Sequence, residues 1–524
     1  MAKLVLSNFS KMTGGYMPGV SPELHHRFIE GFVPHYFSLA SEASDTNLKQ
    51  KLLPPYPLVL SPTVTTTGFY AGHYPTVMIA NEGAALTNVI LSTDLWHFYS
   101  EDNAQTDLGI PSGTPATNAG IDAIIFNGKI LTTHPFNTRL YHGALSATPS
   151  WAASTGTALT AVAVHFLEPF LDEAHVVDAS SHLGPRHLVR IVAADFSVSA
   201  GIDLGGAWNI LDNRNYNDRY AALFAYPSES GRVVKETTCF LWNGVTGSSW
   251  DYKTTLKGKY CTSIVKDGVL YAFTQLGQTL VCSRLNGSSF EEVNRLKNTV
   301  VSTALGIPKT RIATDGDFFI ILASSSGNTT AESPLYWNPV TGESFYLEKA
   351  IATLAYKSVL TAIDNNNSTV RYLSYQNSGA VGFLYKVTLE NSTKADMGAQ
   401  YKSNFIPVPI DKIHGDAPMG RGKINRIDIE YNTKAPNVNN IIALTLTTKD
   451  DNVSETYSTF TATVKSTTAN STRAAVEEKR AIINNVGVLA TEFALDLAVT
   501  VATTSWDLII RRIVIDYTPV AHLS

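Results

Sequence analysis

Four segments of this chain read as short strands joined by tight turns, and this repetition constrains the fold more than any other feature. The clearest segment runs from Cys261 to Val293, where Asp267-Gly268 and Asn286-Gly287 separate runs of apolar and β-branched residues. Asp-Gly and Asn-Gly favour two-residue hairpins, because the preferred turns need a positive φ. The segment therefore predicts four antiparallel strands joined by three tight turns.

The spacing of these hairpins predicts a β-propeller. Similar units occur around Asn127-Gly128, around Asp315-Gly316 and Thr341-Gly342, and from Ser358 to Leu389. The first hairpins of the three later units lie near residues 267, 315 and 365, a spacing of about 50 residues, which suits a four-stranded propeller blade. Extrapolated over residues 63–397, this period predicts six or seven blades.

The propeller is expected to be divergent, because the repeats carry no family marker. The sequence has no Trp-Asp repeat at blade ends, no repeating double glycine and no Ser-x-Asp-x-Gly-x-Thr-Trp box. The pattern is weakest over residues 158–217. There ALTAVAVHFL and HLVRIVAADF read as strands, and an irregular stretch is expected around Glu168–Asp172.

Residues 398–524 are expected to form a β-sandwich of six to eight longer strands. Ile424, Ile427 and Ile429 are interleaved with polar residues, which is typical of a sheet with one buried and one solvated face. The segment Ser471–Asn485 reads either as a helix inserted between strands or as a long solvated loop.

Residues 1–62 are predicted to be an extended N-terminal arm. The only helix expected there lies in SPELHHRFIEG, where Ser21 caps the helix, Pro22 occupies its first turn and Gly31 ends it. Prolines on both sides of this segment disfavour ladders and long helices. The arm is therefore expected to lie across the surface of a partner.

Composition excludes several classes of protein. Only 16% of the residues are charged and the net charge is -5, so the chain carries no basic footprint for specific nucleic-acid binding. The first residues lack the apolar run of about 7–15 residues that an export signal needs, which predicts synthesis in a cytoplasm. The longest apolar run is interrupted by Asp496 and Asp507, so no membrane insertion is expected.

The sequence nominates no catalytic residue, no cofactor-binding residue and no metal ligand. Most histidines occur at or before His187, but no His-Glu-x-x-His or nearby cysteine accompanies them. The segments Asp315–Asp317 and Asp364–Asn367 read as turn chemistry or as calcium loops. No Gly-x-Ser-x-Gly elbow or P-loop occurs. The three cysteines, Cys239, Cys261 and Cys282, read as core residues.

Two further groups of residues have either a structural or a functional interpretation. Tryptophans in the repeat region are expected to form the blade core or to act as platforms on which sugars stack. Basic residues near the C-terminus are expected to form a solvated strand face or an interface with an acidic neighbour. The tryptophans are Trp151, Trp208, Trp242, Trp250 and Trp337, and the basic residues are Arg421, Lys423, Arg426, Arg511 and Arg512.

The whole-chain plan resembles virion structural proteins of tailed bacteriophages, in particular propeller-bearing tail-tip, baseplate or nozzle components. The features that carry the resemblance are a start with Leu6, Asn8, Phe9 and Gly14-Gly15, tyrosine-rich strands such as VLYAFTQLGQTLVCSRL, and the ending IIRRIVIDYTPV. The resemblance implies a structural subunit of a symmetric tail assembly, located in the virion, which binds copies of itself and other tail proteins. It implies no enzyme activity and no cofactor.

Two other functions stay open. One is a carbohydrate-binding or glycan-hydrolysing propeller that recognises a host receptor, for which an open aromatic groove is expected. The other is an intracellular propeller scaffold, which is expected to lack an extended arm.

Overall fold

The computed structural model describes residues 122–346, with gaps at 135, 146–149, 163, 229–234, 248, 298, 302–307 and 325–331, together with residues 408 and 491 and the other strands named below. In these residues the protein is mainly β, as predicted, and the 3-10 helix η2 (Pro308–Arg311) is its one described helical turn. No described helix is long and apolar enough to cross a membrane. The chain divides into two compact units, which are residues 1–64, 335–349 and 388–524, and residues 65–334 and 350–387.

Seven sheets follow one another between Val64 and Thr388 in the described part of the chain. Their strands are β5 (Val64–Ala71), β6 (Pro75–Ala80), β7 (Val89–Thr93), β8 (Phe98–Asp102), β9 (Ala104–Asp107), β10 (Ala123–Phe126), β11 (Lys129–Thr132), β12 (Tyr141–Ala144), β13 (Ala152–Ala153), β14 (Thr155–Gly156), β15 (Leu167–Phe170), β16 (Glu173–Asp178), β17 (Leu188–Val192), β18 (Ser197–Asp203), β19 (Trp208–Tyr216), β20 (Tyr220–Pro227), β21 (Glu236–Trp242), β22 (Tyr252–Lys257), β23 (Lys259–Lys266), β24 (Val269–Leu276), β25 (Thr279–Asn286), β26 (Ser289–Lys297), β27 (Ile312–Asp315), β28 (Phe318–Ala323), β29 (Ser333–Asn338), β30 (Glu343–Tyr346), β31 (Ala355–Ile363), β32 (Thr369–Gln376) and β33 (Val381–Thr388).

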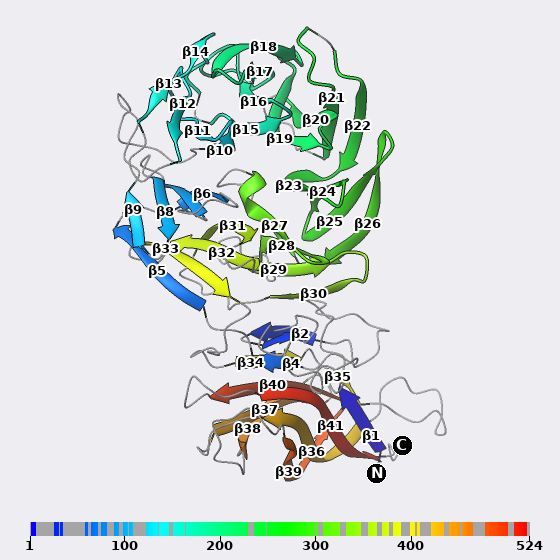
Figure 1. Ribbon diagram of the computed structural model, residues 1–524. Helices are drawn as coiled ribbons and strands as arrows, with labels where there is room; N and C mark the ends of the chain where they lie inside the picture. Colours follow the sequence, from blue (N-terminus) through cyan, green and yellow to red (C-terminus); the bar gives the residue numbers. More distant parts are fainter. Residues whose placement is uncertain are drawn as a thin grey trace. The chain divides into compact units, whose positions relative to one another are not determined.

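These sheets are arranged in a ring. The strand orders are β6 to β9, β10 to β13, β14-β18-β17-β16-β15, β19 to β22, β23 to β26, β27 to β30 and β31-β32-β33-β5. One strand of each sheet contacts the corresponding strand of the next, in the order β6, β10, β15, β19, β23, β27, β31, and β31 contacts β6 again (Figure 1). The strand β5, which comes before the first sheet in the chain, completes the last sheet. This closed order is propeller-like.

The hairpin dipeptides form the turns that the sequence predicts. Asp267 and Gly268 have φ values of 51° and 74°, and Asn127 and Gly128 have values of 45° and 69°. The segment from Cys261 to Val293 lies within the four strands β23 to β26, paired in chain order. The hairpin at Asp267-Gly268 is therefore confirmed. The hairpin near Asn286-Gly287 is also present, but Asn286 ends β25 and pairs with Ser289, so its two-residue loop is Gly287-Ser288.

Residues 158–217, where the strand pattern of the sequence is weakest, are more regular than expected at one point and less regular at another. Residues Glu168–Asp172 form the end of β15 and its turn to β16, where Leu171 has a φ of 53°. By contrast, only Leu167 of the predicted strand ALTAVAVHFL lies in a strand. That prediction is wrong for the other described residues of the run, because apolar side chains such as Leu159 and Val162 pack into the core from irregular backbone.

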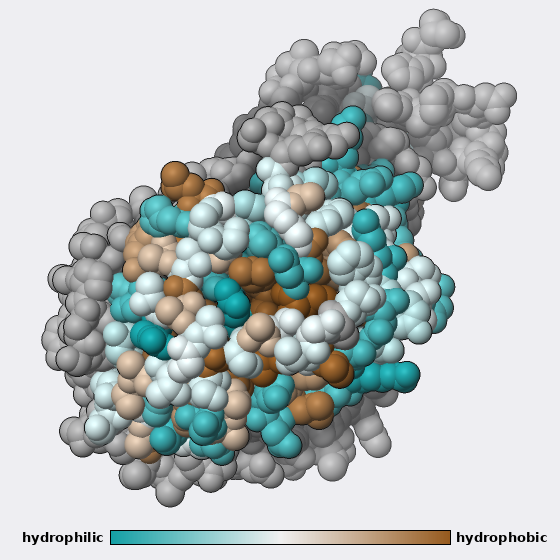
Figure 2. Space-filling model, turned by 90° about the horizontal axis from the view of Figure 1, so that it is seen from above, coloured by the Kyte–Doolittle hydropathy of each residue, from teal (hydrophilic) through white to brown (hydrophobic). Residues whose placement is uncertain are grey.

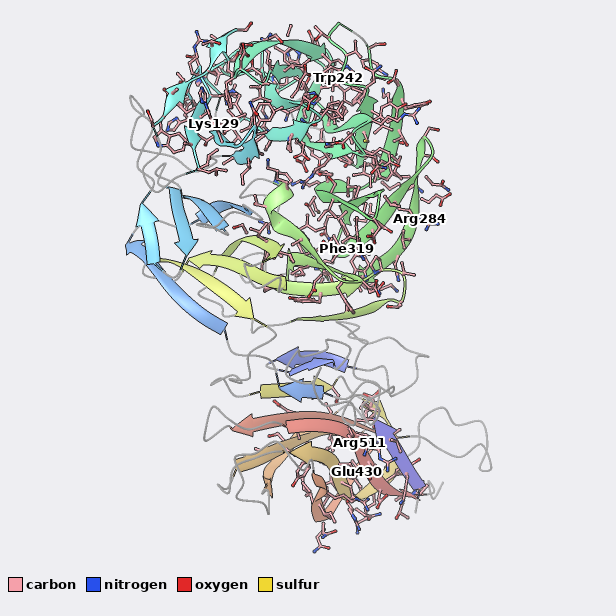
Figure 3. The ribbon with its side chains drawn as sticks, in the orientation of Figure 1. Lys129, Trp242, Arg284, Phe319, Glu430 and Arg511 are labelled. Carbon is pink, nitrogen blue, oxygen red and sulfur yellow. The ribbon has the colours of Figure 1, made fainter. Side chains whose placement is uncertain are left out.

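Apolar side chains fill the spaces between neighbouring sheets of the ring. One cluster joins Phe166, Phe170 and Val189 to Leu223 and Trp242, which belong to the sheets of β15 to β18 and β19 to β22. Trp242 is fully buried and lies among the side chains of the upper sheets in Figure 3. At the surface, hydrophobic and hydrophilic residues are interspersed over the face drawn in Figure 2. Burial between sheets is the principal stabilising contribution to such a ring.

The other unit contains two six-stranded sheets. Their orders are β3-β4-β41-β36-β39, with β1 also beside β41, and β2-β34-β40-β37-β38, with β35 also beside β40. The strands are β1 (Ala2–Leu6), β2 (His26–Glu30), β3 (Phe32–Pro34), β4 (Leu58–Leu60), β34 (Ala399–Ser403), β35 (Ile406–Pro407), β36 (Arg421–Thr433), β37 (Asn440–Asp450), β38 (Val453–Val464), β39 (Glu477–Ala490), β40 (Glu492–Thr500) and β41 (Leu508–Val520).

The predicted alternation is present in these long strands. In β40, Phe493, Leu495 and Leu497 are buried while the residues between them are partly exposed. A period of two places one row of side chains in the core and the other in solvent. Residues 398–524 contribute eight of the described strands, β34 to β41.

The N-terminal segment requires a correction. Residues His26–Glu30, predicted as part of a helix, form β2 and pair with β34, and the rest of the predicted helix lies outside the described residues. Backbone pairing with a distant strand overrides the local helix signals of Ser21 and Pro22. In addition, β1 and β4 pair with β41. The described parts of residues 1–62 therefore belong to the sheets of their own chain.

Both readings of Ser471–Asn485 are also wrong for its described residues. Residues from Glu477 onward form β39, in which Ala481, Ile483 and Val486 are buried and the intervening residues are exposed. The run EEKRAIINN contains good helix formers, but pairing with β36 decides its conformation, and the alternate burial of Ala481 and Ile483 with Ile482 exposed is that of a strand.

Candidate functional site

Charged side chains gather where the strands of the ring contact one another. Asp122 precedes β10, Glu168 lies in β15, Asp212 and Arg214 lie in β19, and Lys309 lies in η2. Asp122 and Asp212 have fully buried side chains, and Arg214 and Lys309 have side chains only 11% and 10% exposed. Burial of so many charges requires compensating partners. We call these five residues the central charge cluster.

Asp122 and Lys309 form one half of the cluster. The Lys309 Nζ lies 2.8 Å from Asp122 Oδ2, and the same oxygen accepts the Leu167 N–H at 2.7 Å. Lys309 also donates to the carbonyl of Leu167. Burial raises the pKa of Asp122, and the Lys309 charge opposes this shift without cancelling it. The ion pair thus ties η2 to both β10 and β15.

Asp212 and Arg214 form the other half. Arg214 Nε lies 3.2 Å from Asp212 Oδ2, which also accepts the Tyr260 hydroxyl at 2.5 Å. Tyr260 is in turn 2.7 Å from Ser263 Oγ. Burial first, and then the Asp212 charge, raise the pKa of Tyr260, so the hydroxyl stays a donor. These bonds join β19 to β23.

Glu168 is held between the two halves. Its Oε1 accepts the backbone N–H of Asn215 at 3.1 Å. Burial raises its pKa, and the charges of Arg214 and Lys309 lower it by less. A carboxyl with a raised pKa is a feature of general acids. Arg214 and Lys309 place positive charge beside Glu168, but Asp122 Oδ1 and Arg214 Nη2 are buried without a hydrogen-bond partner among the described residues. The contacts of the cluster connect residues that belong to four sheets.

The raised pKa of Glu168 gives a pH prediction. The folded state binds the Glu168 proton more tightly than the unfolded state, so this group stabilises the fold increasingly as the pH falls through the folded pKa and costs stability above it. We expect Glu168→Gln to have a higher urea midpoint than wild type at pH 8, with a difference that shrinks toward pH 4. The exposed Glu236→Gln is the control, and an equal gain at every pH would contradict this account.

A second constellation lies outside the cluster. The Ser180 Oγ is 3.1 Å from His187 Nε2, and His187 Nδ1 is 2.6 Å from Asp203 Oδ1. Ser180 is exposed, the His187 side chain is 7% exposed and that of Asp203 is 60% exposed. Asp203 Oδ1 also accepts the Gly205 N–H at 2.7 Å.

These three residues have the connectivity of a nucleophile, a base and an orienting carboxylate. Partial burial raises the pKa of Asp203, but the hydrogen bonds from Gly205 and His187 together lower it, so the carboxylate is ionised at neutral pH. With the proton of His187 on Nδ1, its Nε2 accepts the Ser180 hydroxyl. Sequence reasoning missed this arrangement, because positions 180, 187 and 203 follow no motif spacing.

Four of the five nominated tryptophans fall into two groups, and the fifth, Trp151, is half-buried. Trp242 and Trp337 are fully buried and belong to the core. Trp208 and Trp250 are partly buried against the same cluster as Trp242, and the Lys253 Nζ lies 4.7 Å from the ring centre of Trp208. Core packing therefore accounts for these four rings.

Two of the nominated basic residues near the C-terminus, Arg426 and Arg512, form ion pairs within their own sheet. Arg426 Nε and Arg480 Nη2 each lie 2.5 Å from Asp428, and Arg512 pairs with Glu430. Glu430 and Arg511 are labelled on neighbouring strands of this sheet in Figure 3. Cross-strand acids thus neutralise part of the basic surface.

The remaining nominated residues have structural roles where they are described. All three cysteines are free and buried, and burial raises the pKa of Cys261 to about 12. His175 stacks on Phe170, and burial lowers its pKa to about 3. Within the described residues no three His, Cys, Asp or Glu side chains are arranged to hold a metal. Asp315 precedes the turn at Gly316, whereas Asp364–Asn367 lie outside the described residues.

Comparisons with known proteins gave no sequence relative. No family model and no curated protein matches. Among solved structures, the streptogramin B lyase matches 62% of this chain and 97% of its own with 10% identity and a TM-score of 0.39. The match to the Dos1 propeller covers 64% of this chain and 89% of the Dos1 chain, with 11% identity and a TM-score of 0.41. The match to the exo-β-1,3-galactanase from Phanerochaete chrysosporium covers 84% of this chain and 100% of the galactanase chain, with 7% identity and a TM-score of 0.30. At these values no activity and no residue role is transferred to this chain.

Proposed function

We propose that this chain is a structural subunit of a tailed-bacteriophage tail, of the tail-tip, baseplate or nozzle kind. One observation carries the proposal. The chain builds a ring of sheets and a separate pair of sheets that takes strands from both chain ends. This plan matches the resemblance given by Leu6, Asn8, Phe9 and the ending IIRRIVIDYTPV. A virion component of this kind needs stable surfaces for neighbours rather than a reactive centre.

The finer fold belongs to the same proposal. We infer that the ring is a seven-bladed propeller in which β5 closes the last blade, and that the two six-stranded sheets form a β-sandwich. The contacts from β6 round to β31 and back support the first inference, and contacts of β39 with both β37 and β38 support the second. Closure through β5 joins the ends of the propeller and removes two exposed edges.

The partners follow from this function. Copies of the same chain and other tail proteins bind it, in a closed assembly made in the host cytoplasm and retained in the virion. Closed symmetry is the usual arrangement of identical subunits, and a specific contact buries at least about 1,000 Å² in total.

A second candidate function is hydrolysis of a surface carbohydrate during receptor recognition, and the Ser180–His187–Asp203 arrangement is the observation that favours it. A serine nucleophile suits an ester, such as an O-acyl group on a sugar, rather than a glycosidic bond. Ser180 Oγ would attack the carbonyl carbon while His187 Nε2 takes its proton. The proton would then pass to the leaving alcohol, and water would release the acid from the acyl-serine.

One experiment separates the two functions. The structural function predicts no turnover of acetylated bacterial polysaccharides or of 4-nitrophenyl acetate above the uncatalysed rate, and no labelling by a fluorophosphonate probe. Turnover and labelling that Ser180→Ala abolishes and that the neighbouring Ser181→Ala preserves would favour the hydrolase. Loss of turnover on substitution of a carboxylate alone would indicate glycosidase chemistry instead.

A further inference from the structure

The N-terminal strand β1 is held by one neighbour. Its residues Ala2–Leu6 pair antiparallel with Tyr517–Ile513 of β41, and no other described strand pairs with β1. Next to it, β4 pairs with β41 at Ile509 and Ile510. The same edge of β41 therefore receives two separate pieces of the N-terminal segment. Figure 1 shows the N-terminus at the end of β1, beside the end of the chain.

Two side chains anchor β1. Leu6 is fully buried and Leu4 is 8% exposed, and they lie on the same side of the sheet as their partners Ile513 and Ile515. Lys3 is exposed and faces Asp516 on the other side. The strand thus combines an apolar anchor with a row of backbone pairs, which is how a peptide strand is recognised by an open sheet edge.

The chain between β1 and the next described strand is long enough to reach a neighbour. Nineteen residues, 7–25, separate Leu6 from His26. An extended chain advances about 3.3 Å per residue, so this length spans up to about 60 Å. Because no short turn joins β1 to the strands that follow it, β1 is free to pair with the β41 edge of its own copy or of another copy.

We propose that β1 is an exchanged strand, so that in the assembled state the β1 of one copy occupies the β41 edge of the next copy. This proposal rests on the proposed function as an assembly subunit. Exchange keeps every contact that β1 makes within one chain, because the acceptor edge is identical in each copy. Passed from copy to copy in one direction, the strand links the subunits of a closed ring.

The test uses single cysteines in separate chains. One tagged chain carries Lys3→Cys and a second carries Asp516→Cys, at positions that face one another across β1 and β41. The native cysteines are buried and do not compete. The chains are co-expressed, oxidised and separated without reductant, and the mass of the native sample is measured by light scattering. We expect an oligomer and a covalent pair that contains both tags.

The matched control is the pair Lys423→Cys and Thr518→Cys, which face one another across β36 and β41 within the sheet. Placed in separate chains, these cysteines are expected to give no covalent pair, and placed in one chain they are expected to close within it. An oligomer in which Lys3→Cys and Asp516→Cys join only when they share a chain would overturn the exchange but leave assembly standing. A monomer with the same closure would contradict both the exchange and assembly by this chain alone.

Discussion

Replacing Lys309 by methionine is expected to cost about 3–5 kcal/mol of unfolding free energy, because it leaves a buried carboxylate without its cation. The Lys309 Nζ lies 2.8 Å from Asp122 Oδ2 and also donates to the Leu167 carbonyl. Methionine preserves most of the side-chain volume, so the loss reports the charge rather than a cavity. Urea unfolding followed by tryptophan fluorescence measures the effect.

Two controls define the origin of this loss. The exposed Lys297→Met is expected to change stability by less than about 0.5 kcal/mol. The double variant Asp122→Asn with Lys309→Met is expected to recover part of the loss, since neither charge is then left alone. The deficit of Lys309→Met should also shrink as the pH falls and Asp122 takes up a proton. A deficit that is the same in the double variant and at every pH would contradict a role for the ion pair.

Deleting residues 1–60 is expected to unfold the pair of six-stranded sheets and to prevent incorporation into particles. The deletion removes β1 and β2 and also β3 and β4, so β34 and β41 lose hydrogen-bonded neighbours. The ring from β6 to β31 keeps all the strands that contact one another around it. We therefore expect the unfolding transition of the two six-stranded sheets to be lost and the unfolding transition of the ring to be retained.

A smaller deletion provides the control for this effect. Removing residues 1–6 alone takes away β1 but leaves β2, β3 and β4, and the sheets are expected to stay folded. If the deletion of 1–60 leaves both unfolding transitions intact and incorporation at the wild-type level, the described strands of this segment are not needed for the fold or for assembly.

The sequence was most informative where local chemistry alone decides the structure. Asp267-Gly268 and Asn127-Gly128 form the positive-φ turns that their residue types favour, and the alternating isoleucines of β36 lie in a sheet core. The ring was predictable for the same reason, because hairpins at a regular spacing have few ways to bury their faces.

Prediction failed where distant partners decide the structure. Residues His26–Glu30 and Glu477–Asn485 carry local features of helix or loop, but pairing with β34 and β36 makes them strands. The central charge cluster depends on which sheets lie side by side, and its members come from segments far apart in the chain. The contacts between Ser180, His187 and Asp203 depend instead on the register of β17 and β18 within one sheet, which no motif spacing in the sequence indicates.

Quantitative mass spectrometry of density-gradient-purified particles from an infected host tests whether this chain is a tail subunit. We expect this chain in the particles at a fixed copy number relative to the capsid protein, consistent with a closed ring or trimer on the tail. We also expect it to be retained after a high-salt wash. Its absence from particles that are complete and infectious, with the chain found only in the host lysate, would contradict the account.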